Sequence, residues 1–357
     1  MEITSKIVKK IIHHSLTFSF LFGFLIDSIF LPGAESTHTK EIGALYLSVV
    51  SLSILFREYI VSRNRATKAE GFFHSVFSYI ISFFSGSLLS FVFIYFFRSA
   101  SLAVSWPLFL ILIIVMVLNE FFTSHSFRFL LDIGVLFIVQ TFFVMFILPI
   151  FLQKQTDQIF LISIAISLII SLLYINLLKY FSEVLRDLLS DAYKISFAIP
   201  AVIVTFYLLN VIPPVPLSTK SAEIYHSVIR ESDGSYTVVS ESKSHFSFFK
   251  TKEFHYMEGE KVYFFSAVSA PVGLQSELSH VWEKYDDANE SWKVKLSVPY
   301  SLLGGRDGGY RSYSTIENLS EGKWRVSAKV GERRTVGMVY FNIIKIDKPI
   351  ALIQERI

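Results

Sequence analysis

Apolar and polar residues follow two different patterns along the chain, and the change falls near residue 212. Before it, long apolar runs alternate with short polar segments, and seven such runs lie at about 15–31, 42–61, 72–97, 102–118, 129–152, 159–178 and 195–212. Most of these runs approach the ~20 residues that a helix needs to cross the hydrocarbon core of a bilayer. The pattern predicts an α-helical transmembrane bundle of about seven spans in residues 1–212.

Beyond residue 212 the apolar residues alternate with polar ones, which is typical of half-buried strands. Residues 291–298 and 323–330 keep this alternation without a break, and further strand candidates lie near 222–229, 235–242, 260–268, 278–285, 309–316 and 335–344. So many short strands predict an all-β, sandwich-like soluble domain over residues 222–357. The alternation places Trp292 and Trp324 in its core. The Pro-rich segment 213–221 is expected to be a linker.

Composition and charge sharpen this division. The chain has 357 residues, of which 52% are hydrophobic, and its net charge is +3. Residues 1–212 carry 26 charged side chains and the last 145 residues carry 37, so the charge density roughly doubles. The small net charge gives no reason to expect a nucleic-acid partner. Because Cys is absent and no catalytic or metal-binding motif is found, we expect no metal and no cofactor, and enzymatic activity is disfavoured.

The positive charges of the loops predict an orientation. The N-terminus and the second, fourth and sixth loops hold 11 Lys and Arg residues, whereas the other loops hold three. Because positively charged loops remain in the cytoplasm, the N-terminus is expected inside. Seven spans then place the C-terminal domain outside the cytoplasm, in the periplasm of a cell with an inner membrane. Six spans would place that domain inside.

Four ionisable residues in or beside the apolar runs need an explanation, because charges are costly inside a membrane. They are Asp27, Arg98, Glu120 and Asp132. Asp27 and Arg98 could pair near the outer ends of their spans. One interpretation is a relay or a substrate path, and the other is a set of structural ion pairs at helix ends. Glycines in the runs are expected to let helices approach closely: Gly23, Gly43, Gly86 and Gly134.

In the soluble part, four side chains form the candidate binding set: His280, Trp282, Arg311 and Tyr313. If they meet on an exposed face, the aromatic rings could hold a sugar and the guanidinium could hold an anionic group. The alternative is that they belong to a Trp-rich core in which Arg stacks on aromatic rings.

Several segments resemble a bacterial membrane-protein family whose C-terminal module is known as domain of unknown function 2914. In the membrane part these are residues 20–27 (FLFGFLID), 84–90 (FSGSLLS), 95–101 (YFFRSAS) and 119–121 (NEF). In the soluble part they are residues 280–283 (HVWE), 309–314 (GYRSYS) and 322–326 (GKWRV). The resemblance implies a multi-pass protein of the bacterial cell envelope. It implies no activity and no catalytic residue.

These observations favour a non-catalytic role, in which the helices anchor a β-domain that binds a ligand or partner. The expected partners are the lipid bilayer and an envelope protein or glycan. Three alternatives remain open. One is a small transporter that uses Asp27, Arg98 and Glu120, and another is a signal receptor that needs a separate cytoplasmic partner. The third is an envelope enzyme that acts on lipid-linked glycans.

Overall fold

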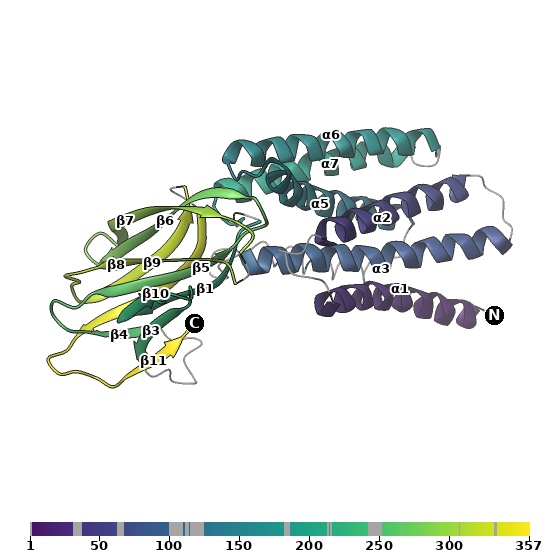
Figure 1. Ribbon diagram of the computed structural model, residues 1–357. Helices are drawn as coiled ribbons and strands as arrows, with labels where there is room; N and C mark the ends of the chain where they lie inside the picture. Colours follow the sequence, from purple (N-terminus) through teal and green to yellow (C-terminus); the bar gives the residue numbers. More distant parts are fainter. Residues whose placement is uncertain are drawn as a thin grey trace. The chain divides into compact units, whose positions relative to one another are not determined.

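The computed structural model describes the chain with several gaps. The described residues are 2–30, 38–62, 68–99, 125–181, 186–212, 216–241, 252–306, 308–331 and 334–357, with the single positions 110, 114 and 214. They form two compact units, one made of helices and the other made chiefly of Pro216–Ile357. Figure 1 shows both, with the helices in purple to teal and the strands in green to yellow.

The described part of the N-terminal unit contains six helices. They are α1 (Glu2–Phe30), α2 (His38–Ser62), α3 (Lys68–Ser99), α5 (His125–Leu152), α6 (Asp157–Phe181) and α7 (Arg186–Leu208). Five of them, all except α1, are long and apolar enough to cross a bilayer, which is consistent with a membrane protein. The apolar part of α1 is shorter and spans Ser15–Phe30. The predicted run 102–118 lies outside the described residues, so the number of seven spans stays a prediction.

Helices α1 and α3 approach each other closely at two glycines. A Cβ atom on Gly23 would lie 2.1 Å from a main-chain oxygen of α3, and one on Gly86 would lie 1.9 Å from a main-chain oxygen of α1. Gly43 lies against an aromatic ring, where a Cβ atom would meet the ring at 2.6 Å. The expectation of close helix approach is therefore confirmed at these three glycines. It is wrong at Gly134, where the nearest side-chain atom would be at an ordinary 3.9 Å.

A row of buried serines lines one side of α6. Ser163, Ser167 and Ser171 are four residues apart, so they share one side of the helix, and all three are buried. The hydroxyls of Ser163 and Ser167 donate to main-chain oxygens four residues earlier. Gln140 on α5 donates from Nε2 to the Ser167 carbonyl oxygen over 3.0 Å. Small residues with internally satisfied hydroxyls let these apolar helices pack closely.

Eleven strands form three sheets in the described part of the C-terminal unit. The strands are β1 (Ser218–Tyr225), β2 (Ser227–Arg230), β3 (Tyr236–Glu241), β4 (Lys252–Tyr256), β5 (Val262–Ser269), β6 (Gln275–Asp286), β7 (Ser291–Leu303), β8 (Tyr310–Ile316), β9 (Gly322–Val330), β10 (Arg334–Lys345) and β11 (Leu352–Arg356). The strand orders are β4-β10-β9-β6-β7, β1-β5-β8 and β11-β3-β2. The predicted strand 222–229 is divided at His226, β1 begins inside the expected linker, and β4 and β11 were not predicted.

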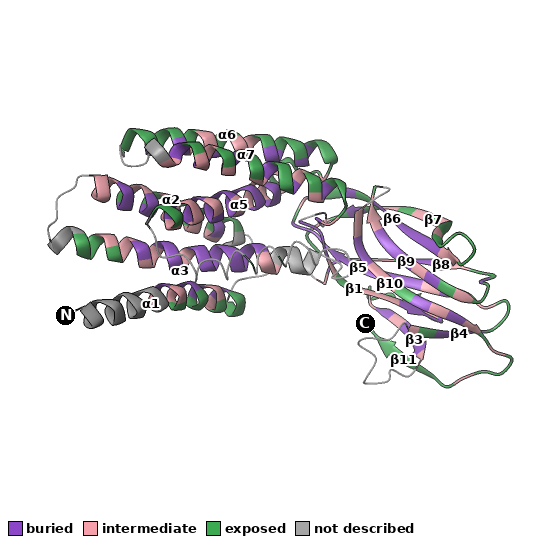
Figure 2. Cartoon of the chain, turned by 180° about the vertical axis from the view of Figure 1, so that it is seen from behind, coloured by how far each residue is buried: buried purple, intermediate pink, exposed green. Residues whose placement is uncertain are grey.

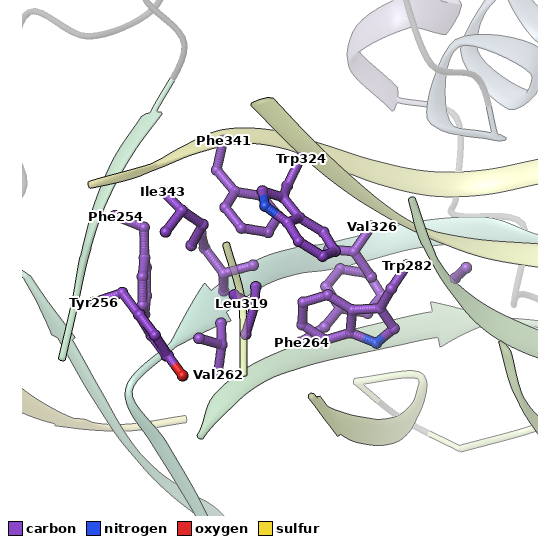
Figure 3. Close-up of a cluster of buried hydrophobic side chains, with 12 residues drawn as sticks. Phe254, Tyr256, Val262, Phe264, Trp282, Leu319, Trp324, Val326, Phe341 and Ile343 are labelled. Atoms are coloured by element: carbon purple, nitrogen blue, oxygen red, sulfur yellow. The ribbon is translucent and has the colours of Figure 1, made fainter. Parts of the chain in front are cut away.

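Three apolar clusters hold the sheets together, and Figure 2 shows the buried residues along the strands. Two clusters lie between the five-stranded sheet and the β1-β5-β8 sheet. One contains Trp282, Trp324 and Phe264 and is drawn in Figure 3. The other contains Leu278 and Val268. A third cluster lies on the opposite face of the β1-β5-β8 sheet and includes residues of β2 and β3. The β1-β5-β8 sheet is thus covered on both faces.

The alternation of β7 predicted the core correctly only beyond a bulge. Trp282 pairs with Leu296, but the next residue of β6, Glu283, pairs with Val294. The extra residue on β7 reverses the faces of the strand. Leu296 therefore packs against the core, whereas Val294 is 59% exposed. The expectation that Trp292 is a core residue is consequently wrong, whereas Trp324 is buried as predicted.

Candidate functional site

Two of the four residues predicted to bind a ligand are buried between the sheets. His280 and Trp282 are both 0% exposed. His280 Nε2 lies 2.8 Å from the Ser266 hydroxyl and 3.3 Å from the Ser312 hydroxyl. Its Nδ1 lies 3.0 Å from the Ser314 hydroxyl, which also accepts a hydrogen bond from Trp282 Nε1 over 3.0 Å. The pair therefore joins the five-stranded sheet to β5 and β8.

This polar layer separates the two apolar clusters that lie between these sheets. Along β5, Phe264 belongs to one cluster and Val268 to the other, with Ser266 between them. Burial lowers the pKa of His280 to about 3, so the imidazole is neutral at ordinary pH. A neutral ring that exchanges hydrogen bonds with buried hydroxyls specifies the register of the packed sheets. We therefore interpret the layer as structural.

The other two predicted residues lie on the opposite face of β8. Arg311 pairs with Ala267 of β5, and Tyr313 pairs with Phe265, on the side of the third apolar cluster. Arg311 Nη1 donates to the Ile357 carbonyl oxygen over 3.4 Å, and the Tyr313 ring lies 6.3 Å from the Tyr236 ring. The structure thus does not bring the four predicted residues together on one exposed face.

A different set of aromatic and basic side chains shares the outer face of the five-stranded sheet. We call this set the aromatic–basic face, and it consists of Tyr285, Trp292, Lys323, Arg325, Lys329 and Tyr340. The ring centroid of Trp292 is 5.2 Å from that of Tyr285 and 5.8 Å from that of Tyr340. Because Tyr340 belongs to β10 and Trp292 to β7, the rings form a continuous row across the sheet.

Two of the three cations of this face, Arg325 and Lys329, are held by one buried carboxylate. Glu283 is 4% exposed and binds Arg325 through two hydrogen bonds, from Nε at 2.8 Å and from Nη2 at 2.7 Å. Lys329 Nζ lies 3.4 Å from Glu283 Oε2. Burial raises the pKa of Glu283, but the Arg325 hydrogen bond and the Lys329 charge outweigh it and lower the pKa. The Arg325 guanidinium also lies 4.5 Å from the Trp292 ring centroid, in a cation–π contact.

A cluster of two histidines and two carboxylates joins all three sheets. His226 Nδ1 lies 2.5 Å from Glu260 Oε1, and its Nε2 lies 3.3 Å from Glu241 Oε1. His255 Nδ1 lies 2.9 Å from Glu241 Oε2. Burial lowers the pKa of His226, but the hydrogen bonds and charges of the two carboxylates outweigh it and raise the pKa. No group of three His, Asp or Glu side chains in the described residues has the geometry of a metal site.

The intramembrane residues form contacts that the sequence did not predict. Asp27 Oδ1 accepts a hydrogen bond from the Tyr46 hydroxyl over 3.2 Å. Asp132 on α5 accepts one from Arg57 Nη1 over 2.6 Å, and Arg57 Nε donates to Glu58 over 2.9 Å. Arg57 is one of the 11 Lys and Arg residues that the sequence analysis assigned to the N-terminus and the second, fourth and sixth loops, but it is a buried residue of α2. The side chains of Arg98 and Glu120 lie outside the described residues, so the Asp27–Arg98 pair stays a prediction.

The aromatic–basic face left a signal in the sequence that a simple alternation rule misreads. Lys323, Arg325 and Lys329 are two and four residues apart, so they share the polar face of one predicted strand. Trp292 would have been assigned to the same side of the domain had the bulge in β7 been recognised. A bulge has no distinct residue pattern here, because the apolar–polar alternation continues through it.

The family match found by comparison with known proteins lies within the β-domain only. The model of a protein family of unknown function, DUF2914, matches residues 275–343, which agrees with the resemblance of the C-terminal domain. No curated protein matches the chain. Among solved structures, an immunoglobulin-like protein of Pseudomonas aeruginosa is 15% identical over 36% of this chain and 98% of its own, with a TM-score of 0.23. A beta-glucosidase of Listeria innocua is 9% identical over 34% of this chain and 16% of its own, with a TM-score of 0.19. Likenesses this weak carry no argument, and the resemblance of the membrane part stays a prediction.

Proposed function

We propose that this protein is a membrane-anchored binding protein. In this proposal the helices span the membrane seven times with the N-terminus inside. The β-domain lies outside the cytoplasm and presents its aromatic–basic face to a ligand or partner. The observation that carries the proposal is the row of aromatic rings beside Arg325 on an outer sheet face. Exposed aromatic rings with fixed basic groups are typical of recognition surfaces.

The interior of the β-domain supports an outer binding surface. Large side chains fill the space between the sheets, where Trp282, Trp324 and Phe341 pack together in the view of Figure 3. Between the two apolar clusters, His280 forms hydrogen bonds with Ser266 and Ser314. By contrast, Tyr340 is 40% exposed, and Val294, on the same face of the sheet, is 59% exposed. Exposed apolar area of this kind costs free energy in water and favours contact with a ligand.

The absence of Cys from the sequence allows a direct test in cells. We would introduce Val294→Cys into the outer face and, as a control, Ile229→Cys into β2, where Ile229 is 56% exposed. Each thiol is labelled with a membrane-impermeant maleimide in intact cells and again in purified protein. If the face is occupied in cells, labelling of Val294→Cys is slowed there several-fold relative to the purified protein, whereas Ile229→Cys is not slowed.

Two results would contradict the proposal. If both cysteines react only after the cells are permeabilised, the β-domain is not outside the cytoplasm. If Val294→Cys and Ile229→Cys show the same ratio of rates between cells and purified protein, the outer face has no ligand in cells. A Trp292→Ala change made with Val294→Cys should restore the faster rate, because it removes the ring on which contact is proposed to depend.

A further inference from the structure

We propose that the ligand of the aromatic–basic face is an acidic saccharide chain, an inference that rests on the proposed function. The juxtaposition that carries it is a row of three aromatic rings in contact with Arg325, whose recessed guanidinium shares a buried carboxylate with Lys329. The rings supply flat apolar surfaces on which the C–H faces of sugar rings can stack. The basic groups supply donors for carboxylate or phosphate groups on those sugars.

The ring row has the geometry of an extended platform. Tyr285, Trp292 and Tyr340 follow one another at 5.2 and 5.8 Å between centroids in edge-on contacts, with 63° and 61° between neighbouring ring planes, so the row offers several ring faces in succession and not one flat plane. The Trp292 ring reaches from the edge strand β7 toward β10, over the intervening strands β6 and β9. A platform that crosses four strands suits a chain molecule better than a compact small ligand.

The charges of the face favour an anionic ligand. Among the aromatic–basic face and its carboxylate, Lys323, Arg325 and Lys329 carry three positive charges and Glu283 one negative charge, which leaves +2; Glu253 of β4 and Glu277 of β6 lie on the same side of the sheet outside this set. Both oxygens of Glu283 already accept hydrogen bonds from the face itself. They bind Nε and Nη2 of Arg325, and the guanidinium has a further hydrogen-bond partner in the Tyr340 hydroxyl. The ammonium groups of Lys323, which is exposed, and Lys329 each carry three donors, so the face offers donors that the ligand has to match with acceptors.

The depth of the cations distinguishes a chain from a flat charged surface. The side chains of Arg325 and Lys329 are only 22% and 14% exposed, whereas Tyr340 is 40% exposed. Anionic groups must therefore approach along the rings to reach these nitrogens. A saccharide lying flat on the rings can place a carboxylate between them, whereas the headgroups of a planar membrane would meet the rings first. A polyanion without rings gains nothing from the platform.

The test uses the full-length protein in nanodiscs and polygalacturonate oligosaccharides as the probe. Their methyl esters are the matched control, because they have the same sugar backbone without the charge. Binding is measured by calorimetry at two salt concentrations. We expect polygalacturonate to bind at least tenfold more tightly than the ester and inorganic polyphosphate, and to weaken as salt rises. Anionic phospholipid vesicles form the fourth arm and are expected to bind less tightly.

Variants separate the two parts of the site. Trp292→Ala should weaken polygalacturonate binding about tenfold. Lys323→Gln should weaken it less and should reduce its salt dependence, because Lys323 is exposed and its loss leaves Glu283 paired. Lys348→Gln, which removes an exposed charge outside the face, is the control and should change nothing.

Equal binding of the methyl ester, equal binding of polyphosphate, or binding of vesicles alone would each overturn the inference. Failure of the saccharide inference can be distinguished from failure of the proposed binding function. If Val294→Cys is protected in cells but polygalacturonate does not bind, the face has a ligand of another class. If Val294→Cys is not protected, the proposed function itself fails.

Discussion

Replacement of His280 by Gln should remove part of the acid sensitivity of the β-domain. His280 is fully buried, and burial lowers its pKa from 6.5 to about 3 in the folded state. Between these two values the unfolded chain binds a proton that the folded domain does not. The stability contributed by keeping the imidazole neutral is therefore present above pH 6.5 and is lost progressively as the pH falls toward 3.

The size of the effect follows from the two pKa values. One unit of pH between them is worth about 1.4 kcal/mol. At pH 5, which is 1.5 units below the unfolded value, the loss amounts to about 2 kcal/mol. Gln can still exchange hydrogen bonds with the surrounding hydroxyls, but it does not titrate. The wild-type protein should therefore lose about 2 kcal/mol more than His280→Gln between pH 7 and pH 5.

Urea unfolding of the full-length protein in detergent, followed by tryptophan fluorescence, measures this difference. Trp106→Phe in both proteins leaves three tryptophans, and all three belong to the β-domain. Other titrating groups, including His226, are the same in both proteins and cancel in the comparison. Identical pH dependence in the two proteins would refute the reasoning, because it would mean that His280 is protonated in the folded state.

Three further predictions concern packing and charge. Gly86→Ala should destabilise the helical unit by about 1–3 kcal/mol, because its methyl group would meet an α1 carbonyl oxygen, whereas Gly71→Ala in open space should not; thermal unfolding in detergent compares them, and equal midpoints would contradict the prediction. Asp132→Asn should lower the free energy of unfolding by about 3 kcal/mol, because it weakens the buried ion pair with Arg57. Unchanged thermal stability would show that this ion pair does not stabilise the helical unit. The stability lost in Glu241→Gln should be largest near pH 5–6. Glu241, with a pKa of about 2, is charged there, whereas its partner His226 loses its charge at higher pH, as the pH rises through its raised pKa. A loss that keeps growing at higher pH in urea unfolding would count against this charge pairing.

The strength of the sequence patterns explains which parts of the fold could be predicted. Apolar runs define helices because a span needs ~20 apolar residues whatever its neighbours are. Strict alternation located β7 and β9 because a strand with one packed and one exposed face alternates along its own sequence. The strands β4 and β11 were not predicted because each has only five residues, and β11 in addition is fully exposed and has no apolar–polar alternation. Their strand geometry depends on pairing with β10 and β3, which only the folded domain provides.

The candidate site depended on a feature that periodicity cannot show. The sequence pattern singled out His280 and Trp282. It could not decide whether their face of the strand is buried, because a second sheet covers that face and the pattern of one strand does not show which of its faces is covered. The bulge between Trp282 and Glu283 then reverses the exposure of β7. A one-residue slip moves a whole set of side chains to the opposite face. The same slip places Trp292 over Arg325 and creates the proposed site.

The residues that carry the family resemblance turn out to be largely those that hold the fold. Segments 20–27 and 84–90 meet at Gly23 and Gly86, where two helix backbones approach closely. In segment 280–283, His280 and Trp282 join two sheets through buried hydroxyls. Glu283 differs, because its carboxylate faces outward and fixes Arg325 of segment 322–326. Among the described residues of these segments, the Glu283–Arg325 pair combines a buried carboxylate with a guanidinium on the outer face, so it links the matched region 275–343 to the aromatic–basic face.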